Sequence, residues 1–388
     1  MTASLRRRRR AQRKARARRW GTIALITAGA ALLLVGLPYV IWRGPYVIDA
    51  GHLDEGELRK GSAALVTGIR TAVVAFTAAL GAGVALLYTA RTYRLTRRGQ
   101  ITDRFTKALE RLGSPEIYVR IGGVLALEQI VQDAPEQAAT DAARVLGHFV
   151  RHRAPKAETQ PAAAEASSNP LPTEPEADVQ AALTALTRTE SRTHIDPRER
   201  LDLRGLHLAG ARLHGADLTD ADLMGATLTD ADLSKATLTR ANLHSASLTG
   251  AQLVEAQFSR AYLVGAKLTG ATLFRATLTN ADLTAATLTG ANLFGATLTE
   301  ADLTGATLTS ANLGSASLTE ARLSGAKLTE VSLREATLTK ADLRASDLST
   351  AKSLVPAQIT SARTDEDTKL PPRFYVSTGA SAVSWSAS

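Results

Sequence analysis

The sequence predicts an α+β multidomain protein that joins a two-helix transmembrane hairpin, a short cytoplasmic helical module and a four-sided β-solenoid. Three observations predict this architecture. Two long uncharged runs lie within the first 90 residues, a helical pattern of apolar residues follows them, and leucine then recurs at every fifth position from residue 203 to residue 348. The length of 388 residues is consistent with several domains.

The composition excludes several classes of site. The chain contains no cysteine, which excludes a disulfide scaffold, a Cys-ligated zinc or iron–sulfur centre and a cysteine nucleophile. Only 4% of the residues are aromatic, so the core has to be aliphatic. The net charge of +9 is uneven: residues 1–100 hold 18 basic and 4 acidic residues, and the remaining 28 basic and 33 acidic residues give −5. A basic head on a slightly acidic body indicates a local basic anchor rather than a nucleic-acid-binding domain.

The N-terminal part predicts a membrane hairpin. Residues 20–42 and 71–90 are uncharged runs of 23 and 20 residues, and each is long enough for a helix that crosses a hydrocarbon core of ~30 Å. A cleaved signal peptide is the alternative for the first run. That run is longer than the apolar core of a usual signal peptide, however, and a second span follows it.

The flanking charges predict the orientation of this hairpin. The leader 1–19 is strongly basic and four arginines follow the second span, whereas the loop 43–70 carries four basic and four acidic residues. By the positive-inside rule we expect both termini to be cytoplasmic and the loop to be external. The leader is expected to contact anionic lipid headgroups rather than nucleic acid, through Arg6, Arg7, Arg8, Arg9, Arg10, Arg13, Lys14, Arg16, Arg18 and Arg19.

Residues 91–153 predict a cytoplasmic helical module. Apolar residues recur there with helical spacing in three stretches. No proline lies between Ser62 and Leu112, so the second span is expected to continue as one long helix. His148 and His152 have a spacing that can bind a metal ion, but no cluster of carboxylates or thiols lies nearby. Solvent-exposed histidines are therefore the preferred interpretation.

The segments on either side of the leucine repeat are predicted to be a linker and two caps. Residues 154–176 contain five prolines among Ala, Glu and Ser, which is typical of a semi-extended linker. A short capping helix is predicted at 177–190, with Asp178 as its N-cap, and it is expected to cover the first end of the solenoid. Residues 351–388 are predicted to form a C-terminal cap and tail, because the repeat register breaks at Ser353.

The segment 201–350 has a five-residue period. Leucine occupies 29 of the 30 central positions, Phe258 occupies the other, and alanine lies two residues before 26 of them. Neither an α-helix nor a flat strand brings every fifth residue to one face. The remaining solution is a chain that turns a corner every five residues, so that each central residue points toward a common axis.

The number of sides follows from the residue between alanine and leucine. This residue alternates with a period of ten, typically Asp or Asn and then Thr or Ser, which favours an even number of sides: four rather than three. A coil of 20 residues then stacks Asp282 on Asp302 and Thr287 on Thr307. Thirty repeats give about 7.5 coils, in which Ala and Leu fill the axis and the other three residues of each repeat face water.

Stretches such as Ala281-Asp282-Leu283-Thr284 resemble the A(D/N)LXX motif of the pentapeptide repeat family. The resemblance covers about 150 residues and implies a right-handed quadrilateral β-helix. The upstream part is similar to bacterial membrane proteins that place a two-span hairpin before such repeats, through residues 99–105 (GQITDRF) and 119–123 (VRIGG). This similarity implies a multi-pass protein of the bacterial inner membrane and assigns no chemistry to those two stretches.

The outward positions of the solenoid do not predict an enzyme. A convex surface of Thr, Asp, Asn, Ser and Gly offers no pocket where titratable groups converge, so we expect no catalytic residue and no cofactor. No metal site is expected either, because His207, His214 and His244 do not share a stacked position.

One outward feature is apolar. Val254, Phe274 and Phe294 are spaced by 20 residues, so they are expected to stack as a stripe on one side. Exposed apolar ladders often mark contact sites, in this case for a protein partner or a second copy of the chain. The alternative is that these side chains only stabilise one another.

The predicted function is a membrane-anchored, non-enzymatic scaffold or protein-binding surface, with the lipid bilayer and an unidentified protein as partners, no nucleic acid, and a homodimer as a further candidate. The family resemblance implies one alternative, because some members mimic DNA, bind DNA gyrase and protect it from quinolones. That activity needs a strongly acidic rod, whereas residues 201–350 hold 12 basic and 15 acidic residues. An accessory regulator of a membrane transport or signalling complex is the other alternative.

Overall fold

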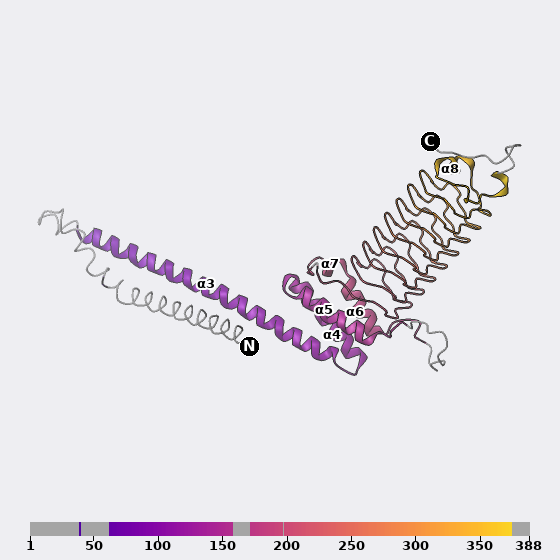
Figure 1. The fold of residues 1–388 in the computed structure, drawn as a ribbon. Coiled ribbons are helices and arrows are strands. Elements are labelled where there is room, and N and C mark those ends of the chain that lie inside the picture. The colour runs from indigo at the N-terminus through magenta and orange to yellow at the C-terminus, as the bar shows by residue number, and fades with distance from the viewer. Residues whose placement is uncertain (1–38, 40–61, 158–170, 197, 375–388) are drawn as a thin grey trace, which may run out of the picture. The chain divides into compact units, whose positions relative to one another are not determined.

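The computed structural model describes residues 39, 62–157, 171–196 and 198–374. The chain divides into two compact units, Met1–Gly99 and Gln100–Ser388. Helix α3 (Ser62–Leu112) crosses from the first unit into the second. The other helices that the structure describes flank the solenoid (Figure 1): α4 (Ile117–Asp133), α5 (Pro135–Arg153), α6 (Ala177–Thr187) and α7 (Thr189–Arg192) before it, and α8 (Pro356–Ser361) and the 3₁₀-helix η2 (Pro372–Phe374) after it.

Helix α3 is uninterrupted, as the absence of proline predicted. Its stretch Thr71–Tyr93 is long and apolar enough to cross a membrane, with a mean hydropathy of 1.9, and none of it is buried. The predicted second span, 71–90, lies within this stretch. The first predicted span, 20–42, lies outside the described residues apart from Tyr39, as do the basic leader and most of the loop 43–70.

Hydroxyl groups along α3 are satisfied within the helix. Each of four threonine hydroxyls donates to the carbonyl oxygen four residues earlier, at 2.6 to 2.9 Å: Thr71, Thr77, Thr89 and Thr92. This local hydrogen bond removes the need for a water partner. These four threonines are therefore compatible with an apolar environment.

The last turns of α3, from Gln100 onward, pack with α4, α5 and α6 in one hydrophobic core. The close approach of α3 and α4 depends on Gly123. A Cβ atom there would lie 2.9 Å from the backbone nitrogen of Leu112 and 3.0 Å from the carbonyl oxygen of Ala108. The last turns of α3, together with α4 and α5, lie where three helical stretches were predicted in residues 91–153. Gly123 of the VRIGG motif acquires a packing role.

A buried ion pair joins α4 to α6. The Nε of Arg120 donates to Oδ2 of Asp178, and both side chains are buried. Arg120 also donates to the carbonyl oxygens of Ser114 and Pro115, at 3.2 and 2.6 Å. The prediction that Asp178 is the N-cap of its helix was wrong: Glu176 holds that position, and the Asp178 carboxylate lies in the first turn against Arg120.

Helix α6 closes the first coil of the solenoid. The side chain of Gln180 donates to the carbonyl oxygen of Arg212 (2.8 Å) and accepts from its backbone N–H (2.9 Å). The carbonyl oxygen of Thr187 accepts from the N–H of Asp217 at 2.7 Å. These bonds serve backbone groups that have no preceding coil to pair with. Helix α6 thus occupies most of the segment predicted as a capping helix, 177–190, but it ends at Thr187, and α7 begins at Thr189.

The ends of the predicted linker 154–176 are bonded to the solenoid rather than free. The carbonyl oxygen of Pro155 accepts from the N–H of His207, and the N–H of Ala157 donates to the carbonyl oxygen of Gly205, each at 2.8 Å. The carbonyl oxygen of Pro172 lies 2.8 Å from Nε2 of His207. Residues 158–170 lie outside the described residues. The Pro-rich composition predicted no core there, but backbone pairing needs no apolar side chain.

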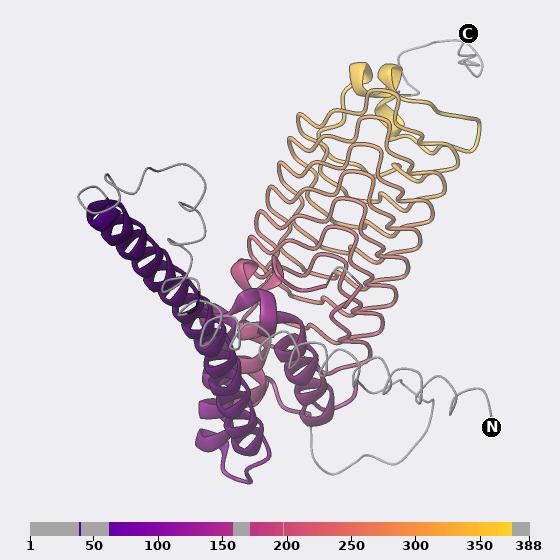
Figure 2. The same cartoon turned by 90° about the vertical axis from the view of Figure 1, so that its left-hand side faces the viewer.

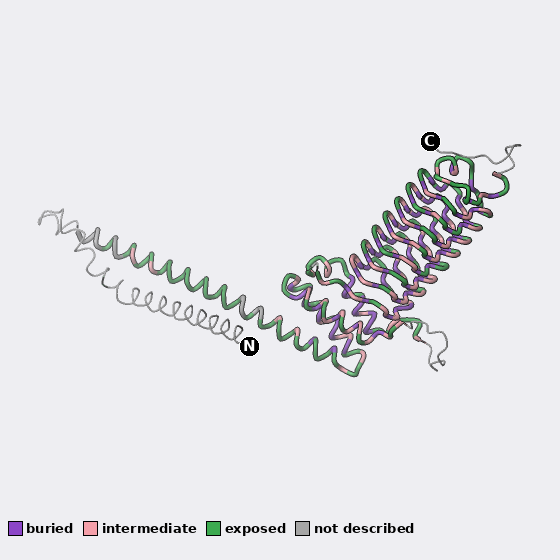
Figure 3. Tube along the Cα trace, in the orientation of Figure 1, coloured by how far each residue is buried: buried purple, intermediate pink, exposed green. Residues whose placement is uncertain are grey.

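The solenoid stacks coils of 20 residues, as the sequence predicted. From Asp202 to Ser332, parallel bridges join the residue before each central residue to the residue 20 positions on, including Asp282 to Asp302 and Thr287 to Thr307, and Figure 2 shows the stacked coils. These bridges are isolated, so the described part of the solenoid contains no longer strand. The central residues, including Phe258, are buried on the axis together with the alanines (Figure 3). The axis is thus an aliphatic core that runs through every coil.

Each corner is a tight turn. The N–H of the alanine donates to the carbonyl oxygen of the leucine three residues earlier, as from Ala286 to Leu283 at 2.9 Å. The residue just before the alanine has φ between 53° and 69° throughout most of the solenoid. A type II turn requires this left-handed residue, which glycine adopts without strain. Side-chain-bearing residues such as Ala285 and Arg240 also adopt it, which the sequence period alone did not indicate.

The C-terminal cap closes the last coils. Ser353 marks the predicted register break, and Leu354 takes the buried position instead. The pairing distance then grows: Asp342 pairs with Arg363, 21 positions on, and Asp347 pairs with Lys369, 22 positions on. Gln358 of α8 donates its side-chain amide to two backbone carbonyl oxygens of the solenoid, both at 2.8 Å. Both ends of the rod are thereby closed by hydrogen-bonded caps.

Candidate functional site

The outward residues of the solenoid form ladders whose members are 20 residues apart. Most ladders are polar and uniform. One consists entirely of threonine over six coils: Thr229, Thr249, Thr269, Thr289, Thr309 and Thr329. Two places depart from this pattern, and half a coil separates them along the chain, so they lie on opposite sides of the rod.

The first is the predicted apolar stripe, here called the aromatic ladder (Val254, Phe274 and Phe294). The rings of Phe274 and Phe294 stack with centroids 6.0 Å apart and planes 7° apart. The guanidinium carbon of Arg275 lies 5.1 Å from the centroid of Phe274, within cation–π distance. Phe294 keeps 38% of its surface exposed, and Val254 and Phe274 are half-buried. The structure therefore brings the three predicted residues together.

Gly314 continues this ladder by one coil and shapes its end. A Cβ atom at Gly314 would lie 2.9 Å from Cδ2 of Phe294, so the missing side chain leaves room for the ring. Neither Gly314 nor Arg275 was placed at this ladder from the sequence. Both could have been found by writing the repeat in rows of 20 residues.

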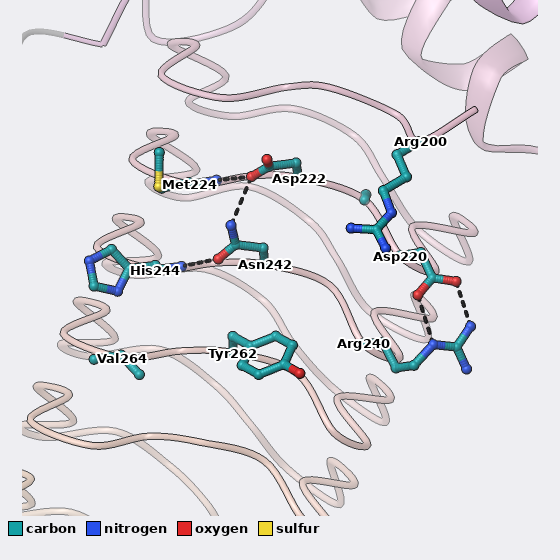
Figure 4. Close-up of a pocket in the computed structure, with 10 residues that line it drawn as sticks. Arg200, Asp220, Asp222, Met224, Arg240, Asn242, His244, Tyr262 and Val264 are labelled. Carbon is teal, nitrogen blue, oxygen red and sulfur yellow. Dashed lines mark hydrogen bonds and ion pairs between the residues drawn. The ribbon is translucent and has the colours of Figure 1, made fainter. Parts of the chain in front are cut away.

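The second place is a depression of about 420 Å³ on the opposite side, here called the Tyr262 depression (Figure 4). Its floor carries Asp222 and Asn242, whose side chains are hydrogen-bonded at 3.0 Å (Asn242 Nδ2 to Asp222 Oδ1), and the exposed ring of Tyr262. The full lining is Arg200, Asp220, Ala221, Asp222, Met224, Arg240, Asn242, His244, Tyr262 and Val264. Sequence reasoning missed this depression, because it arises from side chains of different length in neighbouring ladders.

The charged wall of the depression is internally paired. Arg240 donates from Nε and Nη2 to the two carboxylate oxygens of Asp220, at 2.7 and 2.5 Å. These hydrogen bonds lower the pKa of Asp220, burial opposes them, and the positive charges of Arg240, Arg200 and Arg192 lower the pKa further. A carboxylate held ionised in this way is a poor proton donor near neutral pH. The lining offers paired charges, the side-chain amide of Asn242 and the rings of His244 and Tyr262, which suit binding.

Acidic residues do not form a continuous negative ladder. Several acidic side chains are paired with basic ones in the next coil or in the same coil: Asp220 with Arg240, Asp302 with Arg322, Glu320 with Lys340 and Asp342 with Arg344. Residues 201–350 hold 12 basic and 15 acidic residues, so the net charge of the rod is only −3. The described surface therefore lacks the extended negative potential that mimicry of DNA would require.

The histidines singled out from the sequence are separate from one another. His148, His152, His214 and His244 are exposed, and His207 contacts the carbonyl oxygen of Pro172. Within the described ranges, no group of three or more His, Asp or Glu side chains has a geometry that could hold a metal ion. The basic leader, which was predicted to contact lipid, lies outside the described residues.

Comparison with known proteins identifies the solenoid. The family model of the pentapeptide repeats matches in eight copies between residues 202 and 352. The solved structure of HetL, a pentapeptide repeat protein involved in heterocyst differentiation regulation in the cyanobacterium Nostoc sp. strain PCC 7120, is 36% identical. That match covers 39% of this chain and 75% of HetL, with a TM-score of 0.16. This chain belongs to the pentapeptide repeat family.

Two further solved structures of pentapeptide repeat solenoids are similar to this family member. Full-length QnrB1, a plasmid-mediated fluoroquinolone resistance protein, is 17% identical over 41% of this chain and 84% of its own, with a TM-score of 0.32. A pentapeptide repeat protein from the Arabidopsis thaliana thylakoid lumen is 35% identical over 32% of this chain and 72% of its own, with a TM-score of 0.24. No curated protein matches the sequence.

Proposed function

We propose that this pentapeptide repeat protein is a membrane-anchored scaffold, without enzymatic activity, whose solenoid binds another protein in the cytoplasm. The observation that carries the proposal is the aromatic ladder. The described surface of the rod is made mostly of Thr, Ser, Asn and charged residues, and outside the Tyr262 depression the aromatic ladder places partly exposed apolar side chains in three successive coils. Isolated apolar features that contain aromatic rings are typical of protein contact sites.

The ladder also suggests the chemistry of the partner. Phe294 presents an exposed ring edge, and the guanidinium of Arg275 lies beside Phe274. An apolar side chain of the partner can pack on the rings, and a neighbouring carboxylate can pair with Arg275. We therefore expect a partner segment that combines an apolar residue with an acidic one.

Two features support the membrane anchor. The stretch Thr71–Tyr93 is apolar and exposed, and Arg91, Arg94, Arg97 and Arg98 lie at its C-terminal end. With the basic leader, these charges favour a hairpin in the bacterial inner membrane with both termini in the cytoplasm.

Carbonate extraction should leave the full chain in the membrane fraction, and protease added to spheroplasts should spare the C-terminus. Release by carbonate, or cleavage of the C-terminus from outside, would contradict the anchor.

The binding role is tested by proximity labelling from the C-terminus in native cells. A partner is a protein labelled by the wild type and by a Thr304→Asp control, which alters an exposed position away from the ladder. Its labelling should be lost in a Phe274→Asp, Phe294→Asp double variant whose melting temperature is close to that of the wild type. If the double variant labels the same proteins, the aromatic ladder is not the binding surface.

The same full-length chain in detergent separates this proposal from the topoisomerase alternative. We expect no effect on DNA supercoiling by gyrase, because residues 201–350 carry 12 basic residues against 15 acidic ones and the rod is therefore only weakly negative. Inhibition at micromolar concentrations would favour the DNA-mimic alternative.

A further inference from the structure

Helix α4 has an uncovered apolar face. Tyr118 and Leu125 are 84% and 55% exposed, although a helix on the surface of a soluble module normally places polar residues outward. The three charged residues of α4 are already engaged: Arg120 with Asp178, Glu128 with Arg188, and Asp133 with Arg104. In the part of the chain that the structure describes, the outer face of the first two turns of α4 is therefore uncharged and open.

The two glycines of the VRIGG motif differ in what the single chain requires of them. Gly123 faces the backbone of α3, where a Cβ atom would clash. A Cβ atom at Gly122 would have no neighbour within 4 Å, and this glycine lies in regular helix without a positive φ. Glycine inside a helix is destabilising relative to alanine. The fold of one chain therefore explains Gly123 and leaves Gly122 without a role.

Tyr118, Ile121, Gly122 and Leu125 lie on one side of α4, because they follow the spacing i, i+3, i+4 and i+7. This set, here called the α4 stripe, is symmetric about a point between residues 121 and 122. In an antiparallel pair, Tyr118 lies opposite Leu125 of the second copy, and Ile121 lies opposite Gly122 of the second copy. The Ile121 side chain of each copy thus faces the gap left by Gly122 of the other copy. The same contact occurs twice, as an isologous interface requires.

We propose that the α4 stripe is a self-association surface, on which α4 of a second copy of this chain packs in antiparallel orientation. The self-complementarity of the stripe favours a second copy over the helix of another protein. Its four residues fall well below the roughly 800 Å² per partner of a standard stable interface. The pair is accordingly weak and depends on concentration. This inference does not depend on the partner proposed for the aromatic ladder.

The first test measures the mass of the full chain in detergent by sedimentation over a range of concentrations. The wild type should pass from monomer to dimer as concentration rises. Gly122→Leu fills the gap, so it should shift this transition at least tenfold upward in concentration. Its melting temperature at low concentration should be unchanged or higher, because a Cβ atom at this position has no neighbour within 4 Å and glycine destabilises a helix interior. Gly123→Ala is the matched control, and its melting temperature should fall.

The second test determines the register and uses the absence of cysteine from the chain. Chains carrying Tyr118→Cys are mixed with chains carrying Leu125→Cys, with tags of different size, and are oxidised. The mixed disulfide should form several-fold more than either homodimer. In the antiparallel pair, two Tyr118 positions lie roughly 10 Å apart along the helix at ~1.5 Å per residue, beyond the ~7 Å that a disulfide spans.

Three results would overturn the proposal. They are a chain that stays monomeric at every concentration, a Gly122→Leu variant that dimerises like the wild type, and homodimeric disulfides that form as readily as mixed ones. A monomeric chain that copurifies with a foreign helical protein would assign the stripe to that protein instead.

Discussion

Leu283→Ala tests whether the leucine axis holds the rod together. Leu283 lies in the middle of the solenoid and is fully buried, as are Leu263 and Leu303 in the coils on either side. The substitution removes three carbon atoms, which costs about 2.4 kcal/mol at ~0.8 kcal/mol per carbon. The neighbouring coils are held at a fixed spacing by backbone hydrogen bonds, such as the 2.7 Å bond from the N–H of Leu283 to the carbonyl oxygen of Asp302.

Because these bonds resist collapse, part of the space vacated in Leu283→Ala should remain as a cavity. The total loss of unfolding free energy is then expected to be about 3–4 kcal/mol, within the range of Leu-to-Ala changes in protein cores. Urea unfolding of the full chain in detergent, followed by circular dichroism, measures this loss. Hydrogen exchange at the adjacent coils gives a local value, because a solenoid can unfold in parts.

Thr304→Ala is the matched control for Leu283→Ala. Thr304 is exposed, and its hydroxyl donates to Oδ1 of Asp302 at 2.6 Å. Loss of this bond should cost about 1 kcal/mol or less. If Leu283→Ala costs no more than Thr304→Ala, the axis does not provide the stability of the rod, and the stacking of outward ladders would have to provide it.

Three further outcomes are expected. Arg120→Ala leaves the Asp178 carboxylate buried without its partner, so the full chain should lose about 3–5 kcal/mol of unfolding free energy in thermal or urea melts; a loss below about 1 kcal/mol would contradict the burial of this pair. Arg240 lowers the pKa of Asp220 in the folded chain. This carboxylate therefore stabilises the fold above its unfolded pKa of about 3.9, and the stabilisation disappears as the pH falls through the lower folded pKa. Arg240→Leu should raise the pKa of Asp220 in an NMR titration, and an unchanged value would refute the pairing. Gln358→Ala leaves two buried carbonyl oxygens without their donor, so it should cost about 1–3 kcal/mol and increase hydrogen exchange in the last coil first.

The solenoid could be predicted in detail because its geometry is determined by a short repeated sequence. The period of five placed Leu283 on the axis, and the alternation of period ten placed Asp282 on Asp302. Both relations depend only on the order of residues within one coil and are repeated about seven times. The aromatic ladder followed from the same relation, because Phe274 and Phe294 are one coil apart.

The features that escaped prediction depend on contacts between distant segments. Asp178 has the sequence context of an N-cap, but its partner Arg120 lies 58 residues earlier, and no local pattern indicates that pairing. Gly123 is required by packing against α3 rather than by a turn. The Tyr262 depression depends on differences in side-chain length between neighbouring ladders. A one-dimensional pattern of apolar and polar residues does not contain this information.

The contacts of Arg120, Gly123 and Asp178 also bear on whether the Pro-rich segment sets the orientation of the solenoid. A free linker would let the rod adopt any orientation relative to the end of α3. In the second unit, however, Gly123 packs on the last turns of α3, Arg120 pairs with Asp178 in α6, and Gln180 of α6 bonds to Arg212 of the first coil. This continuous series of buried contacts fixes the rod to residues 100–112. Deletion within residues 158–170 should therefore leave the hydrogen-exchange protection of the Arg212 backbone N–H intact, whereas Gln180→Ala should reduce this protection. The opposite result would show that the Pro-rich segment, and not α6, positions the solenoid.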